Sequence, residues 1–290
     1  MGGPPPLPPV PPPSWLGEPL LRSGDGAPAV IPEASPPPPA PVAPPQFNLS
    51  NKQYDGHLIG GGGDYPPDTP LSQIRGVLPS HGEPSHKILF VNGIANSVDD
   101  HYKSLQAIAD RAGAEVVGVY NATEGGGKDL LQCLGDKLDI GKNAAVDTLA
   151  GTLYAELSSS GNAPINIMAH SQGGLITSRA LEDVKQRLMD DGLSRAEAEA
   201  RLSRINVETF GAAAWNYTDG PHYGHHVNAL DPVSTLFGQG FNPLNPLGLF
   251  THGGAGAERD TFVSTQGNLH GFNEVYLPQW ETPFPKDGPK

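Results

Sequence analysis

The sequence predicts an α/β protein built on a mostly parallel β-sheet with helices on both of its faces. From Lys87 onward, short apolar runs rich in β-branched residues alternate with longer segments of helical periodicity. One of these runs, 165–168, passes through a tight turn directly into a helical pattern. Strands separated by helical crossovers pair in parallel, and the helices then cover both faces of the sheet.

Three regions of different composition divide the chain. Residues 1–46 hold 18 of the 32 prolines, and we expect them to form a disordered, proline-rich segment of polyproline II character. Residues 47–85 are rich in Gly, Pro and Asp, which predicts an irregular lead-in with one short strand near Leu58. Residues 86–290 are long enough to bury one substantial core, and we expect them to form the α/β catalytic domain.

The first half of this domain begins with a buried strand. Lys87–Val91 is apolar after its first residue and ends at Asn92-Gly93, a turn signal. The other elements expected in this half are a helix over 102–112, a strand over 115–120, a glycine loop at 125–127 and an amphipathic helix over 143–157.

The second half continues the alternation of strand and helix. A strand begins at Ile165, and after a turn a helix is expected over 175–188. Ser194 and Glu197 have the spacing of a capping box, which predicts a further helix ending near Ile205. Three more strands are expected at 206–210, 226–230 and 261–265, and residues 235–250 show no regular pattern.

A serine occupies the apex of the turn after the Ile165 strand. The sequence there is Ala-His-Ser-Gln-Gly, and a strand–turn–helix with this serine, Ser171, is the nucleophile elbow of serine hydrolases. The sharp turn requires small residues two positions before and after the serine, and Ala169 and Gly173 meet this requirement. Ser171 is therefore the candidate nucleophile, provided that a base and an oxyanion site lie nearby.

An acid and a base follow the later strands. Asp231 comes after the 226–230 strand, and His270 comes after the last strand, which gives the chain order Ser, Asp, His of α/β-hydrolases. In this interpretation His270 accepts the Ser171 proton, and Asp231 orients the imidazole and stabilises its charged form. Alternatives remain open at Asp260, Asp219 and Glu274 for the acid and at His252 for the base.

Two backbone N–H groups would form the oxyanion hole. One is expected from Gln172, the residue after the nucleophile, and the other from the turn after the 87–91 strand. In that turn Gly93 allows the backbone to approach closely, so we expect Ile94 to be the second donor, with Ala95 as the alternative.

The order of these elements resembles the class 3 lipase branch of the α/β-hydrolases over about 87–277. The resemblance is carried by Ala-His-Ser-Gln-Gly-Gly at 169–174, Glu-Thr-Phe-Gly at 208–211, Asp-Pro-Val at 231–233 and the histidine at 270 with a tyrosine at 276. It implies the α/β-hydrolase fold, with Ser171, Asp231 and His270 as the triad of a lipase or phospholipase that needs no cofactor. The sequence departs from the branch at Ala212-Ala213-Ala214 and Ser234, which bears on the substrate more than on the mechanism.

Other functions remain open beside this one. An acyltransferase shares the same triad, and a catalytically silent scaffold would leave the proline-rich segment as the working part. That segment is either a partner for an aromatic-lined groove or a semi-rigid spacer. A proline-rich head without the basic and apolar blocks of a cleavable signal is also similar to lipase-type effectors of bacterial secretion systems, which implies export by such a system.

The apolar stretch 235–250 lies between the candidate acid and base. Its large side chains would supply a lid or an acyl-chain wall over Ser171, and a loop packed onto the core is the alternative. The substrate-binding residues expected from it are Phe237, Phe241 and Leu244.

Composition and motifs exclude several other classes of ligand. A net charge of −13 without a basic stripe argues against nucleic acid and against electrostatic docking to anionic lipid, though not against transient contact with a lipid surface. Cys133 is the single cysteine, so no disulfide can form within the chain. No metal is expected at the cluster of His222, His225, His226 and Asp219, because its spacing fits no common metal site.

Overall fold

The computed structural model describes residues 44–94, 96–122, 143–241, 251–281 and 284. The chain divides into two units, Met1–Val42 and Ala43–Lys290, and all of the described residues belong to the second. The proline-rich segment expected over 1–46 therefore lies almost wholly outside the described residues, as does the glycine loop at 125–127. Among the described residues, no helix is long and apolar enough to cross a membrane.

The described residues form one eight-stranded sheet in the order β2-β1-β4-β3-β5-β6-β7-β8. Strand β1 is antiparallel to both of its neighbours, and the pairs from β4 to β8 are all parallel. The strands are β1 Leu58–Gly60, β2 Gly63–Tyr65, β3 Lys87–Val91, β4 Glu115–Val119, β5 Ile165–His170, β6 Ile205–Phe210, β7 His222–Asn228 and β8 Glu258–Phe262. The mostly parallel α/β class predicted from the sequence is confirmed.

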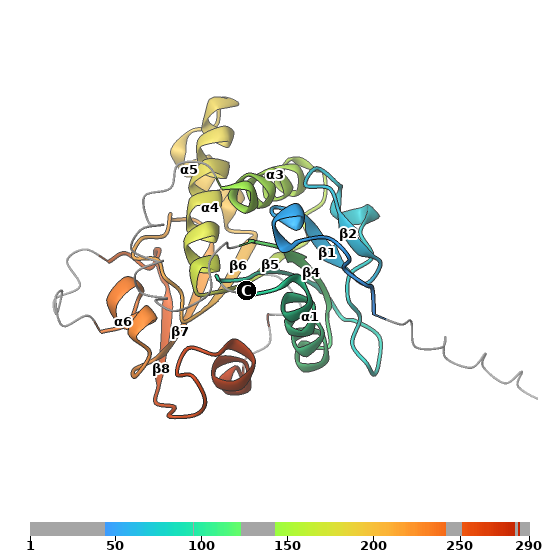
Figure 1. The fold of residues 1–290 in the computed structure, drawn as a ribbon. Helices are drawn as coiled ribbons and strands as arrows, with labels where there is room; N and C mark the ends of the chain where they lie inside the picture. Colours follow the sequence, from blue (N-terminus) through green and yellow to red (C-terminus); the bar gives the residue numbers. More distant parts are fainter. Residues whose placement is uncertain (1–43, 95, 123–142, 242–250, 282–283, 285–290) are drawn as a thin grey trace, which may run out of the picture. The chain divides into compact units, whose positions relative to one another are not determined.

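Helices cover both faces of this sheet, as Figure 1 shows: α3 and α4 lie on one face, and α1 lies on the other. The longer helices are α1 Val98–Ala112, α3 Ala144–Ser158 and α4 Gln172–Asp190, and the shorter ones are α5 Arg195–Leu202 and α6 Pro232–Phe237. Short turns of helix complete the fold at η1 Asn51–Tyr54, η2 Leu71–Gln73, η3 Phe272–Tyr276 and η4 Leu277–Gln279.

Alternate residues of the central strands supply the two halves of the core. On β3, Leu89 and Val91 pack with α3 and α4, whereas Ile88 and Phe90 pack with α1 and the C-terminal residues around Trp280. Successive side chains of a strand point to opposite faces, so a strand buried on both sides must be apolar throughout. This explains why β3 is apolar after Lys87 and why β5 is apolar apart from Asn166 and His170, which are both hydrogen-bonded.

The order of the strands changes direction at β3, which pairs with β4 on one side and with β5 on the other. The chain therefore passes from β3 to β4 on one side, and then crosses back over β3 to β5 on the other side. Ligands in open α/β sheets bind in the crevice at the carboxyl ends of the strands beside such a switch point. The residues after β3 and β5, which include Gly93 and Ser171, lie at this position.

Several element boundaries differ from the sequence-based expectation. Strand β7 covers His222–Asn228 rather than 226–230, and β8 covers Glu258–Phe262 rather than 261–265. Strand β8 is an edge strand, and its first four residues are exposed, so its first half carries charged rather than apolar side chains. Apolar pattern alone therefore placed it too far toward the C-terminus.

Local capping moves two further boundaries. Helix α1 begins at Val98 rather than near 102 because the Ser97 side chain accepts a hydrogen bond from the Asp100 N–H. Helix α6 occupies Pro232–Phe237, the start of a region for which no element was expected, and Asp231 caps it by accepting from the Val233 N–H.

The short strand expected near Leu58 is present, and it pairs with β2, which the sequence analysis did not identify.

Candidate active site

The turn after β5 holds Ser171 in a strained backbone conformation. Its φ and ψ are 58° and −126°, and it is the one residue other than glycine with a positive φ in the described part of the chain. The surroundings fix this conformation: the Ser171 N–H donates to the Phe210 carbonyl at 3.1 Å, and the Ser171 carbonyl accepts from the Ala213 N–H at 2.9 Å. Such strain costs about 1–3 kcal/mol and persists only where the structure imposes it.

Two glycines make room for this turn. A Cβ on Gly93 would lie 2.5 Å from the Ser171 Cβ and 2.9 Å from its Oγ, so the loop after β3 lies directly against the serine side chain. A Cβ on Gly173 would lie 2.2 Å from the Val91 carbonyl oxygen, so the start of α4 packs against the end of β3. Both positions exclude a side chain for steric reasons.

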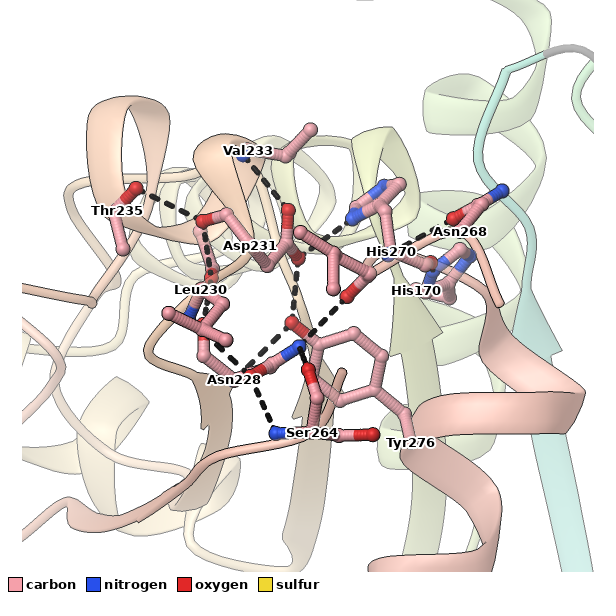
Figure 2. Close-up of polar contacts among 12 residues, drawn as sticks. His170, Asn228, Leu230, Asp231, Val233, Thr235, Ser264, Asn268, His270 and Tyr276 are labelled. Atoms are coloured by element: carbon pink, nitrogen blue, oxygen red, sulfur yellow. Dashed lines mark hydrogen bonds and ion pairs between the residues drawn. The ribbon is translucent and has the colours of Figure 1, made fainter. Parts of the chain in front are cut away.

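The candidate acid and base form a direct pair. His270 Nδ1 donates a hydrogen bond of 2.7 Å to Asp231 Oδ2, and the Asp231 side chain is completely buried (Figure 2). Asp231 Oδ1 accepts from the Val233 N–H at 2.8 Å, and the Tyr276 hydroxyl donates to Asp231 Oδ2 at 2.5 Å. Three donors therefore compensate the buried carboxylate, which otherwise would be costly to keep charged.

Asn228 fixes the two loops that carry this pair. Its Nδ2 donates to the carbonyls of Ser264 and Leu269, and its Oδ1 accepts from the N–H groups of Leu230 and Ser264. Figure 2 shows this side chain below Asp231, between the loop that follows β7 and the loop that leads to His270. One buried amide therefore sets the position of the loop that carries His270 relative to the one that carries Asp231.

His170, the residue before the candidate nucleophile, also contacts the base. Its Nε2 donates to the His270 carbonyl at 2.8 Å, and the two imidazole centroids are 4.7 Å apart. Burial, together with the neighbouring His270, lowers the pKa of His170 to about 3. His170 is therefore a neutral ring that donates from Nε2 and packs against the face of the His270 ring.

The atoms between which a proton would pass are both buried and unengaged. Within the described residues, neither Ser171 Oγ nor His270 Nε2 has a hydrogen-bond partner. The Nδ1 atom of His270 is taken by Asp231, so Nε2 is the nitrogen left to accept a proton. The hydrogen bond between a nucleophile and its base often forms only when substrate is bound.

The candidate oxyanion donors flank the serine. Gln172 is the first residue of α4, and Ile94 follows Gly93 in the loop that lies against Ser171. No hydrogen-bond acceptor within the described residues takes the backbone N–H of either residue. Ala95, the alternative, lies outside the described residues.

The residues named as alternatives for the acid and the base are paired with other side chains or exposed. His252 pairs with Asp219 at 2.8 Å on an exposed part of the surface, and Asp260 lies 3.4 Å from His226. Glu274 is exposed on the turn after His270. None of the three acids is hydrogen-bonded to His270 in the described structure, where Asp231 holds its Nδ1.

Two histidines of the cluster considered for metal binding, His225 and His226, are engaged in hydrogen bonds with other residues. His225 Nδ1 lies 2.7 Å from Thr209 Oγ1 and its Nε2 lies 2.8 Å from the Gly253 carbonyl, while His226 Nε2 lies 2.7 Å from Glu208. Within the described residues, no group of three or more His, Cys, Asp or Glu side chains is arranged to hold a metal ion.

The expected substrate-binding residues have three different placements. Phe237, at the end of α6, is half-buried against Ile94, Ala213 and Val233, so it packs beside the candidate oxyanion loop. Phe241 is 70% exposed, and Leu244 lies outside the described residues.

A polar pocket of about 170 Å³ opens beside Gln172, and a larger cavity of about 630 Å³ lies between residues 67–71 and α3, away from the triad residues.

No protein-family model and no curated protein matches this sequence. Several solved structures show a partial likeness to this chain, at low sequence identity and low TM-score. A lipase-esterase related protein from Clostridium acetobutylicum is 9% identical with a TM-score of 0.39, over 70% of this chain and 94% of that one. A hormone-sensitive lipase from a metagenome library is 14% identical with a TM-score of 0.38, over 64% and 68%. The type II thioesterase BorB from the borrelidin biosynthetic cluster is 14% identical with a TM-score of 0.33, over 64% and 85%.

Three residues that contact the candidate triad were not identified as site residues from the sequence. Asn228 ends a strand and His170 precedes the serine, and neither position carries a local signal of its contacts. Tyr276 was noted only as part of the class 3 lipase pattern, and its hydrogen bond to Asp231 spans 45 residues. Only the folded arrangement shows what these side chains touch.

Proposed function

We propose that this protein is a serine hydrolase of carboxylic esters and that its substrates are lipids. The observation that carries the proposal is the combination of a strained, buried Ser171 at the switch point of the sheet with the buried His270–Asp231 pair. An ordinary surface turn does not account for a buried serine held at positive φ. Nor does it account for a buried imidazole whose Nε2 has no hydrogen-bond partner within the described residues.

In the proposed reaction the Ser171 oxygen attacks the ester carbonyl carbon while His270 Nε2 takes the hydroxyl proton. The negative charge that develops on the carbonyl oxygen is stabilised by the N–H groups of Ile94 and Gln172. The protonated imidazole then gives its proton to the leaving alcohol, and an acyl ester on Ser171 remains. Water, deprotonated by the same nitrogen, hydrolyses this ester, and Asp231 stabilises the imidazolium in both halves of the reaction.

Exposed apolar side chains around the site support a lipid substrate. Six large hydrophobic residues are exposed in the described part of the chain, and four of them follow β6, β7, α6 and β8: Trp215, Leu230, Phe241 and Val263. Asp231 and the loop to His270 leave the sheet at the same edge. An apolar rim at the mouth of a site suits a substrate presented by a lipid surface, and the charge of −13 favours uncharged rather than anionic lipid.

Covalent labelling tests the catalytic part of the proposal. A fluorophosphonate probe should modify wild-type protein, and peptide mapping should place the adduct on Ser171. We expect Ser171→Ala and His270→Ala to abolish labelling, and kcat for a soluble ester to fall by about 10³-fold or more in both variants. Folded wild-type protein that remains unlabelled with and without detergent would overturn the proposal.

A second comparison tests the lipid part. Phe241→Ser with Val263→Ser should lower the rate on dispersed long-chain esters by about tenfold or more and leave the rate on a soluble short-chain ester within about twofold. Leu78→Ser is the matched control, because Leu78 is also exposed but adjoins Val77, which pairs with Val116 near the amino end of β4. Equal losses on both substrates would argue against the lipid assignment.

A further inference from the structure

Three buried amide side chains connect the two candidate oxyanion donors. Asn92 directly follows β3, Asn121 lies two residues after the end of β4, and Gln172 begins α4. All three are at least nine-tenths buried. Burying three primary amides is unfavourable unless they are hydrogen-bonded, so their mutual contacts indicate what each of them fixes.

Asn92 holds the peptide that carries the first donor. Its Nδ2 donates to the Gly93 carbonyl at 2.7 Å and to the Asn121 carbonyl at 3.0 Å, and its Oδ1 accepts from the Asn121 N–H at 2.9 Å. In a trans peptide the C=O and the following N–H point in opposite directions. Because the Gly93 carbonyl is turned toward Asn92, the Ile94 N–H must point the other way, and no acceptor within the described residues takes it.

Asn121 holds the residue that carries the second donor. Its Nδ2 donates to Gln172 Oε1 at 2.9 Å, and its Oδ1 accepts from Asn143 Nδ2 at 3.3 Å. The backbone of Asn121 therefore binds Asn92, while its side chain binds Gln172. Asn121 is therefore hydrogen-bonded both to Asn92, which holds the Ile94 donor, and to Gln172, which carries the other donor. Strand β4 itself supplies no group to the triad.

We propose that Asn92 and Asn121 are positioning residues that fix the spacing and orientation of the Ile94 and Gln172 N–H groups before substrate binds. This rests on the proposed function. Oxyanion donors act on charge that exists only in the transition state, so their misplacement lowers kcat while the affinity for substrate in its ground state changes little. A network with a merely structural role would instead lower stability and leave the kinetics of the folded fraction unchanged.

The isosteric change Asn92→Asp removes the N–H donors to Gly93 and Asn121 and keeps the size of the side chain. We expect kcat on a soluble ester to fall by about 30-fold or more with KM within about threefold, and the affinity for a trifluoromethyl ketone to fall in parallel with kcat. Asn121→Asp should give the same pattern, because it removes the donor to Gln172 and leaves the backbone contacts with Asn92 in place.

Asn166→Asp is the matched control, since Asn166 is a buried asparagine on β5 whose Nδ2 donates to the Lys87 carbonyl and whose Oδ1 accepts from Asn206. It should lower stability and leave kcat within about twofold. Wild-type protein unlabelled at Ser171 would remove the proposed function itself. Labelled wild-type protein with folded Asn92→Asp or Asn121→Asp at near-normal kcat, or with losses no larger than those of Asn166→Asp, would overturn the positioning role alone. If Asn92→Asp does not fold, Asn121→Asp decides.

Discussion

Replacing Tyr276 by Phe removes one donor from the candidate catalytic carboxylate and also removes the hydroxyl that accepts from the Asn228 N–H at 3.3 Å. The hydroxyl donates to Asp231 Oδ2 at 2.5 Å, next to the His270 hydrogen bond at 2.7 Å on the same oxygen. Burial, and after it the charge of Asp231, raise the pKa of Tyr276, so the hydroxyl stays protonated and remains a donor throughout the working pH range. The ring itself is buried in the core and would keep its packing.

The size of the effect follows from the contacts that remain. A hydrogen bond to a charged group contributes about 1.5–3 kcal/mol. Without it, Asp231 keeps the donors Val233 and His270, and its less compensated charge attracts the protonated His270 ring more strongly. If about half of roughly 2 kcal/mol passes to the protonated ring, the imidazolium is stabilised by about 1 kcal/mol, which corresponds to about 0.7 pH unit.

The assay is the pH dependence of kcat/KM for a soluble ester, whose acid limb reports the protonation of the base in the free enzyme. A group stabilised in its protonated form loses its proton at higher pH, so the acid limb of Tyr276→Phe should move upward by about 0.7 unit. Tyr223→Phe is the control, because its buried hydroxyl donates to the Thr218 carbonyl at 2.8 Å and does not touch the triad. An acid limb that stays in place or moves downward would refute this account of Tyr276.

Three further predictions test the site and its surroundings. Gly93→Ala should lower the rate of fluorophosphonate labelling by about 10²-fold, because its Cβ would lie 2.5 Å from the Ser171 Cβ, whereas Gly151→Ala faces open space and should label normally. Asn228→Ala breaks four hydrogen bonds, three of which join the loops of the candidate acid and base, so thermal unfolding should show a loss of about 2–4 kcal/mol and kcat should fall at least tenfold; an unchanged kcat would contradict its role. Burial holds three histidines neutral in the folded state, so these three take up protons on unfolding below pH ~6.5. Their contribution lowers the free energy of unfolding in urea by about 3 kcal/mol between pH 6.5 and 5.5, and the raised pKa of His226 offsets a small part of this fall; a flat profile would contradict the prediction. These histidines have pKa values lowered to about 3, about 3 and about 4, in the order His101, His170 and His225.

Local sequence patterns predicted the parallel sheet, the strand–turn–helix with Ser171 at its apex, and the two residues, Asp231 and His270, that form a buried hydrogen bond. Each of these leaves a signal within a few residues: an apolar run, small residues around a turn, or a polar residue directly after a strand. The ends of β7 and β8 were misplaced because their burial depends on neighbours in space. An edge strand such as β8 needs no continuous apolar run, and its charged start gave no strand signal.

The contacts that hold the candidate triad in place could not be predicted, because they join residues far apart in the chain. His170 reaches the His270 carbonyl across 100 residues, and Arg111 on α1 binds the Trp280 carbonyl across 169. The loop that carries His270 has no strand of its own after β8. It is held at one end by Asn228 and at the other by Phe272 and Trp280, which pack under the sheet with Phe210. The geometry of the candidate base therefore depends on packing against the sheet as much as on the motif at its edge, so core substitutions at these aromatic residues should change kcat as well as stability.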